Sequence, residues 1–125
     1  DPEALTGAVR VALGRAIVQR IAAGHEELPV ITLEPRLEQI LQDAVGGRGD
    51  AGGLEPTLAE RLQGQLAETA QRQESAGQPA VLLVAPALRP WLARFLRFAV
   101  PGLRVLAYNE VPENRRVRLV AAVGA

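Results

Sequence analysis

The chain has 125 residues, 48% of them apolar and 22% charged, which is typical of one folded domain and not of a disordered segment. It has no cysteine and no lysine, all 14 basic residues are arginine, and it has one histidine (His25) and one serine (Ser75). This composition excludes disulfides, thiol catalysis, Schiff-base lysines, serine triads and histidine-rich metal sites. We therefore expect neither an enzyme nor a cofactor.

The formal net charge of zero hides two oppositely charged halves. Residues 1–78 carry 7 arginines and 12 acidic residues, for a net charge of −5, and residues 79–125 carry 7 arginines and 2 glutamates, for +5. Such halves suit packing on each other or docking between neighbours in an assembly. A neutral, lysine-free chain does not favour a nucleic-acid partner. The longest apolar run, residues 80–88, contains a proline and is far too short to span a membrane.

The first predicted element is a helix over residues 3–23. Asp1 and Pro2 suit a helix start, and Gly24 suits its end. Between them an apolar side chain recurs every four residues, at Leu5, Val9, Leu13, Ile17 and Ile21. This spacing places one apolar stripe along the helix.

The next segments predict a strand over 28–33, a helix that begins at Pro35 and ends at Gly46, and a helix over 56–76. Between the two helices lies a glycine-rich loop, residues 46–53. The loop contains Gly47-x-Gly49-x-x-Gly52, the spacing of a dinucleotide-binding motif. That motif needs a strand before it and a helix opening within it. Here a helix precedes it, so we interpret the segment as a flexible loop.

The continuous apolar run Val81–Val84 predicts a central strand with neighbours on both sides. A helix over 88–99 follows, then strands over 103–111 and 117–123 joined by a turn at 112–115. The order is α-β-α-α-β-α-β-β. We expect an α/β fold with a small mixed sheet of about four strands packed with helices, in which the last two strands form a hairpin.

The helix over 88–99 holds the single tryptophan and both phenylalanines. At 100° per residue, one arc is apolar (Leu88, Leu92, Phe95, Leu96 and Ala99) and the opposite arc carries arginines, with Trp91 and Phe98 on the border. One interpretation is a helix that covers the sheet and exposes a solvated arginine face. The other is a protein-docking surface, because tryptophan and arginine anchor interfaces. Its candidate residues are Arg89, Trp91, Arg94, Arg97 and Phe98. We expect Trp91 to be only partly buried and Phe95 to be the core aromatic.

Several segments, in order and spacing, resemble the FHIPEP family of bacterial type III export proteins. In the second half these are residues 79–84 (PAVLLV), 87–90 (ALRP), 94–97 (RFLR), Pro101 and 105–111 (VLAYNEV). Upstream they are residues 9–15 (VRVALGR), 30–34 (VITLE) and 53–56 (GLEP). Ala107 stands where the family usually has serine. Injectisome relatives share the strand at 105–107, so resemblance to the flagellar members depends on residues 13–15 and 53–56.

The resemblance implies a non-enzymatic docking and gating module of the flagellar type III export apparatus. Family members begin with a multi-span membrane part and end in a cytoplasmic part that assembles as a nonamer beneath the inner membrane. Residues 25–125 would be the last subdomain of that part, and residues 1–24 a linker helix from the preceding one. Implied partners are the other ring subunits and the stalk protein of the export ATPase, with chaperone-bound substrates docking on earlier subdomains. The alternatives are the same module of a virulence injectisome and an RNA- or nucleotide-binding α/β domain.

Overall fold

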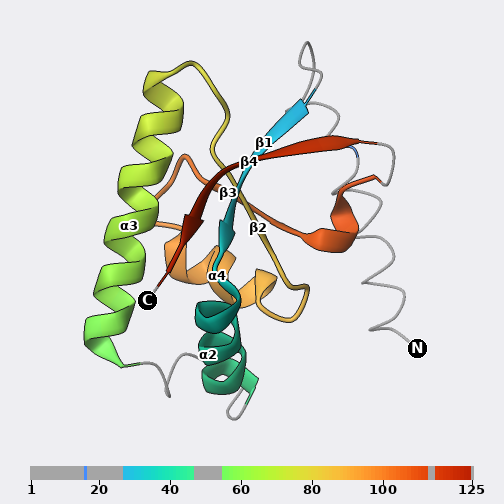
Figure 1. The fold of residues 1–125 in the computed structure, drawn as a ribbon. Coiled ribbons are helices and arrows are strands. Elements are labelled where there is room, and N and C mark those ends of the chain that lie inside the picture. The colour runs from blue at the N-terminus through green and yellow to red at the C-terminus, as the bar shows by residue number, and fades with distance from the viewer. Residues whose placement is uncertain (1–15, 17–26, 47–54, 113–114, 125) are drawn as a thin grey trace.

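The computed structural model describes residue 16 and residues 27–46, 55–112 and 115–124. In chain order the elements are β1 (Glu27–Leu33), α2 (Pro35–Gly46), α3 (Pro56–Ser75), β2 (Val81–Val84), α4 (Arg89–Leu96), β3 (Arg104–Ala107), the 3-10 helix η2 (Tyr108–Glu110) and β4 (Arg116–Val123) (Figure 1). The predicted α/β class and element order are confirmed from β1 onward. The helix predicted over 3–23 and the motif at Gly47–Gly52 lie outside the described residues, except Ala16, which is helical.

The four strands form one sheet in the order β3-β2-β1-β4, and all three pairs are parallel. The prediction for Val81–Val84 is confirmed, because β2 lies between β1 and β3. The predicted mixed sheet with a terminal hairpin is wrong, because β3 and β4 lie at opposite edges and β4 pairs with β1. β3 is only four residues long, and the side chain of Glu110 accepts a hydrogen bond from the Ala107 N–H at 2.9 Å. The seven residues of β1 offer a longer edge for pairing.

The main core lies on one face of the sheet, where α2, α3 and α4 all pack. Its strand residues alternate, as Ile31 and Leu33 in β1 and Leu82 and Val84 in β2. The helices contribute Leu37 and Leu41 from α2, Leu62, Leu66 and Ala70 from α3, and Trp91, Leu92 and Leu96 from α4, and Leu88 joins them from the residue before α4. We call this the helix face.

The opposite side of the sheet, which we call the second face, carries a smaller cluster. It consists of Leu28, Val30, Val81 and Leu106, with Leu83 and Val111 packed against them. β2 is therefore apolar on both sides. This explains why its four residues show no polar alternation.

Candidate docking surface at the end of helix α4

Trp91 lies in the core, and the prediction that it is only partly buried is wrong. It is 5% exposed, whereas Phe95 is only half-buried and stacks on it with ring centroids 4.8 Å apart. The predicted helix runs to residue 99, but α4 ends at Leu96. The buried positions of this shorter helix are Trp91, Leu92 and Leu96, so the apolar arc is turned toward Trp91. Trp91 is a core residue and not part of a docking surface.

Arg89 begins α4 and is also withdrawn from solvent. Its Nε lies 3.4 Å from Oε1 of Glu110, and that oxygen accepts the hydrogen bond from Ala107. The side chain of Glu110 is only 1% exposed, and that of Arg89 is 22% exposed. A buried carboxylate needs such partners, because an uncompensated charge is costly in the interior. Arg89 therefore ties the start of α4 to the end of β3, which is a structural role.

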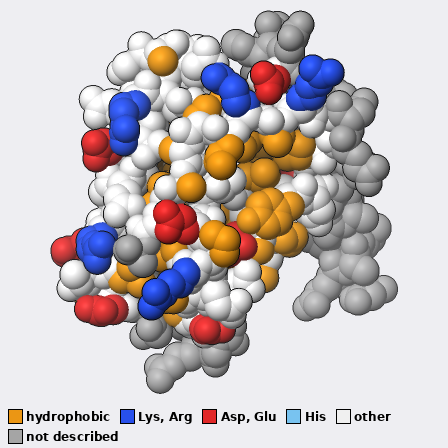
Figure 2. Space-filling view, viewed as in Figure 1, with side chains coloured by type: hydrophobic (Ala, Val, Ile, Leu, Met, Phe, Trp, Pro, Cys, Tyr) orange, Lys and Arg blue, Asp and Glu red, His pale blue; other side chains and the backbone are white. Residues whose placement is uncertain are grey.

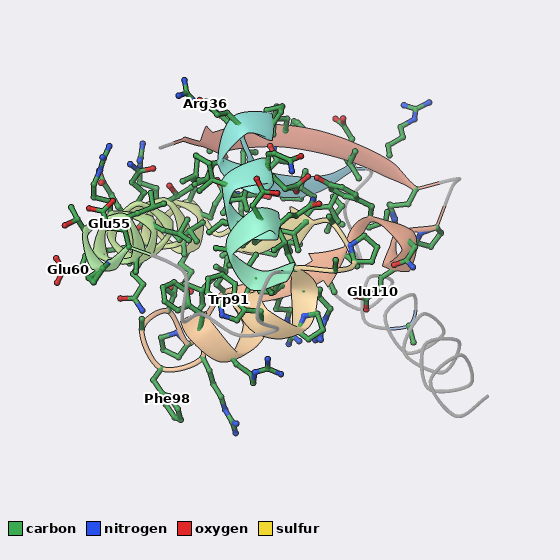
Figure 3. The ribbon with its side chains drawn as sticks, turned by 90° about the horizontal axis from the view of Figure 1, so that it is seen from below. Arg36, Glu55, Glu60, Trp91, Phe98 and Glu110 are labelled. Atoms are coloured by element: carbon green, nitrogen blue, oxygen red, sulfur yellow. The ribbon has the colours of Figure 1, made fainter. Side chains whose placement is uncertain are left out.

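Arg94, Arg97 and Phe98 remain at the surface, at the other end of the helix, and we call them the α4-end patch. Phe98 is 86% exposed, and the guanidinium carbon of Arg97 lies 5.5 Å from its ring centroid. Both arginines are exposed. Figure 3 shows Phe98 pointing away from the body of the protein. The patch thus presents one large aromatic side chain framed by positive charge.

The helix dipole explains only part of the patch. Arginines near a helix C-terminus are favourable there because unpaired carbonyl groups carry partial negative charge. An exposed phenylalanine gains nothing from the dipole and leaves its apolar surface in water. Within the described part of the chain, neither Arg94 nor Arg97 forms an ion pair. Both charges thus remain open to a partner.

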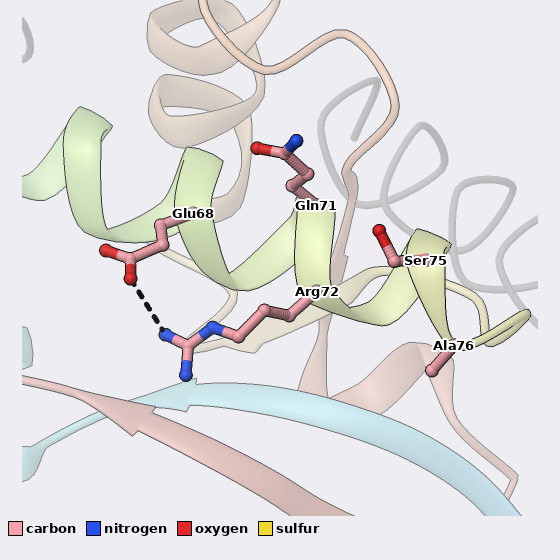
Figure 4. Close-up of a pocket in the computed structure, with 5 residues that line it drawn as sticks. All are labelled: Glu68, Gln71, Arg72, Ser75 and Ala76. Atoms are coloured by element: carbon pink, nitrogen blue, oxygen red, sulfur yellow. Dashed lines mark ion pairs between the residues drawn. The ribbon is translucent and has the colours of Figure 1, made fainter.

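The described surface has two hollows, and the residues that line them do not form a recognisable catalytic or metal site. Figure 4 shows the first, which is lined by Glu68, Gln71, Arg72, Ser75 and Ala76 along α3 and its end. Its ion pair, Arg72 Nη2 to Glu68 Oε1 at 3.7 Å, is exposed on both sides and contributes little. The second is lined by Arg89 and residues 101–106, along the outer edge of β3. Among the described residues, no cluster of acidic or histidine side chains could hold a metal ion.

A polar contact that no sequence pattern predicts lies at the carboxyl ends of the strands. The hydroxyl of Tyr108 donates to Oε2 of Glu38 at 2.8 Å, and the N–H of Ala85 donates to the same oxygen at 3.3 Å. Burial and the Glu38 carboxylate raise the pKa of Tyr108 to about 12. The Glu38 carboxylate thus accepts hydrogen bonds from a neutral phenol and a backbone N–H, and these bonds connect α2 to η2 and to the end of β2. It does not form a reactive acid–base pair.

Glu110 was also missed, although the sequence held a signal for it. It stands in the stretch VLAYNEV, where it is the only charged residue between apolar positions, and such a residue is a candidate for burial with a partner. Glu38 carried no comparable signal. It lies on a helix with many polar residues, and its partner Tyr108 is remote in the sequence.

Comparisons with known proteins match nearly the whole chain. The model of the FHIPEP family matches residues 1–116. Flagellar biosynthesis protein FlhA of Salmonella typhimurium is 52% identical over 124 residues, which cover 99% of this chain and 18% of that protein. The chain therefore spans less than a fifth of this relative.

Solved structures share the fold. The nonameric cytosolic domain of EscV from the type III secretion system has a TM-score of 0.71 at 22% identity, covering 98% of this chain and 36% of that one. Chlamydia pneumoniae CdsV, solved in complex with CdsO, has a TM-score of 0.72 at 24% identity, again covering 98% and 36%. None of the helices in the described residues is both long and apolar enough to cross a bilayer.

Proposed function

Because this chain belongs to the FHIPEP family, we propose that it is a non-enzymatic docking and gating module of the flagellar type III protein export apparatus. The flagellar identity is supported by 52% identity to a flagellar FlhA protein. The solved structures of EscV and CdsV are 22% and 24% identical to this chain and support a common fold only. No described residue supports the RNA- or nucleotide-binding alternative.

We further propose that residues 25–125 are the C-terminal subdomain of a longer protein, and that residues 1–24 are a linker helix from the preceding subdomain. The chain covers 18% of FlhA from Salmonella typhimurium, which supports its being part of a longer protein. By analogy with nonameric EscV, the neighbours would be other subunits of an export ring at the cytoplasmic face of the inner membrane. By analogy with CdsV, the stalk protein of the export ATPase would be a further partner, in the way that CdsV forms a complex with CdsO.

The α4-end patch is the observation that supports a docking function. Phe98, which is 86% exposed beside two exposed arginines, has the residue types that dominate binding energy at interfaces. A partner suited to it offers an apolar pocket with acidic residues at its rim. Trp91 and Arg89 would support this surface from within, because they hold α4 on the sheet and at the end of β3.

A chimera tests the proposed function. The matching segment of Salmonella typhimurium FlhA is replaced by this chain, and swimming in soft agar is measured in a strain that lacks its own FlhA. We expect the chimera to restore swimming. If the chimera accumulates to normal levels but gives no swimming and no export of flagellar subunits, the proposed module function is wrong.

Variants of the same chimera test the patch. Phe98→Ala and the pair Arg94→Ala with Arg97→Ala should reduce swimming and export at unchanged protein levels. The matched control is Arg61→Ala with Arg72→Ala, which removes two exposed arginines from α3. If the patch variants swim as well as this control does, docking does not use the α4-end patch.

A further inference from the structure

The first half of β4 is an open sheet edge. Among the described strands, β4 is outermost and pairs only with β1, and its first four residues, Arg116 to Leu119, are all exposed. In a parallel ladder, alternate residues direct both backbone groups to the same neighbouring strand. Every second residue of this segment therefore presents its N–H and C=O away from β1. No described strand pairs with these groups, and such an edge is a template for strand addition.

Strand alternation gives this edge two chemically different sides, and a bulge follows it. The pairing with β1 runs Val30 with Leu119 and then Ile31 with Ala121, so that Val120 is left without a partner. Before the bulge, Val117 and Leu119 pair with Leu28 and Val30 and therefore share the second face with them. The alternate residues Arg116 and Arg118 lie on the helix face.

The apolar side of the edge extends a buried cluster into solvent. Leu28 and Val30 are 0% and 2% exposed, whereas their partners Val117 and Leu119 are 45% and 60% exposed. In Figure 1 the β4 ribbon crosses in front of β1, and Figure 2 shows hydrophobic side chains gathered across this side of the molecule, with arginines near its border. A strand added beside β4 would cover Val117 and Leu119.

The charges of Arg116 and Arg118 indicate which kind of strand would bind beside β4. In an antiparallel pair of two β4 strands centred on Val117, Arg116 would lie opposite Arg118 of a second copy on the same face. Like charges placed directly opposite are destabilising, which disfavours self-pairing. A strand with acidic side chains on the helix face and apolar side chains on the second face satisfies both sides of the edge.

We propose that the open edge of β4 at Arg116–Leu119 binds, by strand addition, an extended segment of a partner protein in which acidic and apolar side chains alternate. Hydrogen bonds between the two backbones contribute to the affinity independently of the partner's sequence. The acidic residues contact Arg116 and Arg118, and the apolar residues contact Val117 and Leu119. This surface is separate from the α4-end patch and does not depend on the proposed function.

The probe is a blocked, fluorescently labelled peptide of four Glu-Val repeats, and its anisotropy is measured against the 125-residue chain at low salt. We expect saturable binding and slower amide exchange at residues 116–119. Arg116→Glu with Arg118→Glu should weaken binding by about tenfold, since it breaks two exposed ion pairs. A peptide with lysine in place of glutamate should bind this variant better than it binds the unmodified chain.

Two matched controls separate this edge from general electrostatics. Arg61→Glu with Arg72→Glu makes the same change in net charge on α3, where both arginines are exposed, and should leave the affinity within about threefold. A peptide of the same composition, with its four glutamates grouped at one end, should bind more weakly. Leu119→Thr keeps the tendency to form a strand, removes apolar surface and should also weaken binding.

Three results would overturn the proposal. One is the absence of saturable binding, and another is equal affinity for the alternating and grouped peptides. The third is sedimentation that shows a dimer of the chain which Leu119→Thr weakens, because the occupant of the edge would then be a second copy. Circular dichroism of each variant verifies that the fold is retained. Since the swimming assay uses other residues, either proposal can fail while the other stands.

Discussion

At the scale of single residues, contacts between remote segments decide which side chains are structural. Arg89 and Glu110 join the start of α4 to the turn after β3, although the two residues are remote from each other in the sequence. Trp91 enters the core, while Phe98, seven positions later, stays in solvent. Residue type alone does not distinguish these cases, because large aromatic side chains serve both cores and interfaces.

Trp91 and Phe98 should respond to truncation in opposite ways. Trp91→Ala is expected to cost roughly 3–5 kcal/mol of the free energy of unfolding, because it empties a well-packed site in the core. Phe98→Ala should stay within about 0.5 kcal/mol, as expected for an exposed side chain. Phe95→Ala should fall between them, because Phe95 is half-buried. Urea melts followed by circular dichroism measure this order, and a smaller loss for Trp91→Ala than for Phe95→Ala would contradict it.

Tyr108 should titrate at unusually high pH. It is the only tyrosine, so ultraviolet absorbance follows it alone, and its pKa is raised to about 12 by burial and by Glu38. Glu38→Gln removes the negative charge and should lower the midpoint toward the ordinary value of about 10.

The raised pKa of Tyr108 also sets the direction of a stability change. Because the folded chain holds the proton more tightly than the unfolded chain does, this contribution is complete below about pH 10. It is lost as the pH rises toward about 12, the folded value. Stability should therefore fall less steeply over this window in Tyr108→Phe. An identical pH dependence in Tyr108→Phe would show that the contact with Glu38 does not influence folding.

At the scale of elements, local signals set where helices begin and end. Pro35 and Pro56 open α2 and α3 as the sequence predicts. α3 ends in a Schellman motif, in which Gly77 has a φ of 74° and the N–H of Gln78 donates to the carbonyl of Gln73 at 2.8 Å. The partners in this motif are close in sequence, so the pattern alone could identify the helix end.

The same substitution at two glycines of this region should change stability in opposite directions. Gly77→Ala forces a side chain into the left-handed region and should cost about 1 kcal/mol. Gly64→Ala lies within α3, where an added methyl group meets no atom within 4 Å, and should stabilise by about 0.5–1 kcal/mol. Thermal or urea melts of both variants test this, and a shift of the same sign in both would contradict the assignment of the helix end.

At the scale of the whole molecule, the order β3-β2-β1-β4 places two strands in the interior of the sheet and two at its edges. All three described helices pack on one face of the sheet and cover the central strands there. Each central strand also has a paired strand on both of its edges. β4 brings the C-terminal end of the described chain back to β1, its first strand. The resulting stability should be uneven across the sheet.

Native-state hydrogen exchange should follow this arrangement. The amides of β2 and of the second half of β1 should exchange slowest, because they lie between paired strands in the core. The outward amides of Arg116–Leu119 should exchange fastest among the strand residues, because they belong to the open half of an edge. Equal protection of the amides along β4 and β2 would contradict this order and would also show that the edge of β4 is not open.

The sequence by itself determined the type and order of the elements from β1 onward, the central position of Val81–Val84, the family, and the absence of cysteine and lysine chemistry. These follow from local signals such as Pro35, Pro56 and Gly77, from uninterrupted apolar runs and from ordered motifs. Of the proposed docking residues, it correctly placed at the surface those that lie at the end of α4.

Only the tertiary structure decided the parallel pairing of β4 with β1, the burial of Trp91, the Arg89–Glu110 contact and the two-sided edge of β4. In sequence, the alternate residues Val117, Leu119, Ala121 and Val123 suggest one apolar face. The bulge at Val120 divides them between two faces. Strand pairing depends on backbone hydrogen bonds and burial between segments far apart in the chain, and the periodicity of one segment does not specify which segment will be its neighbour.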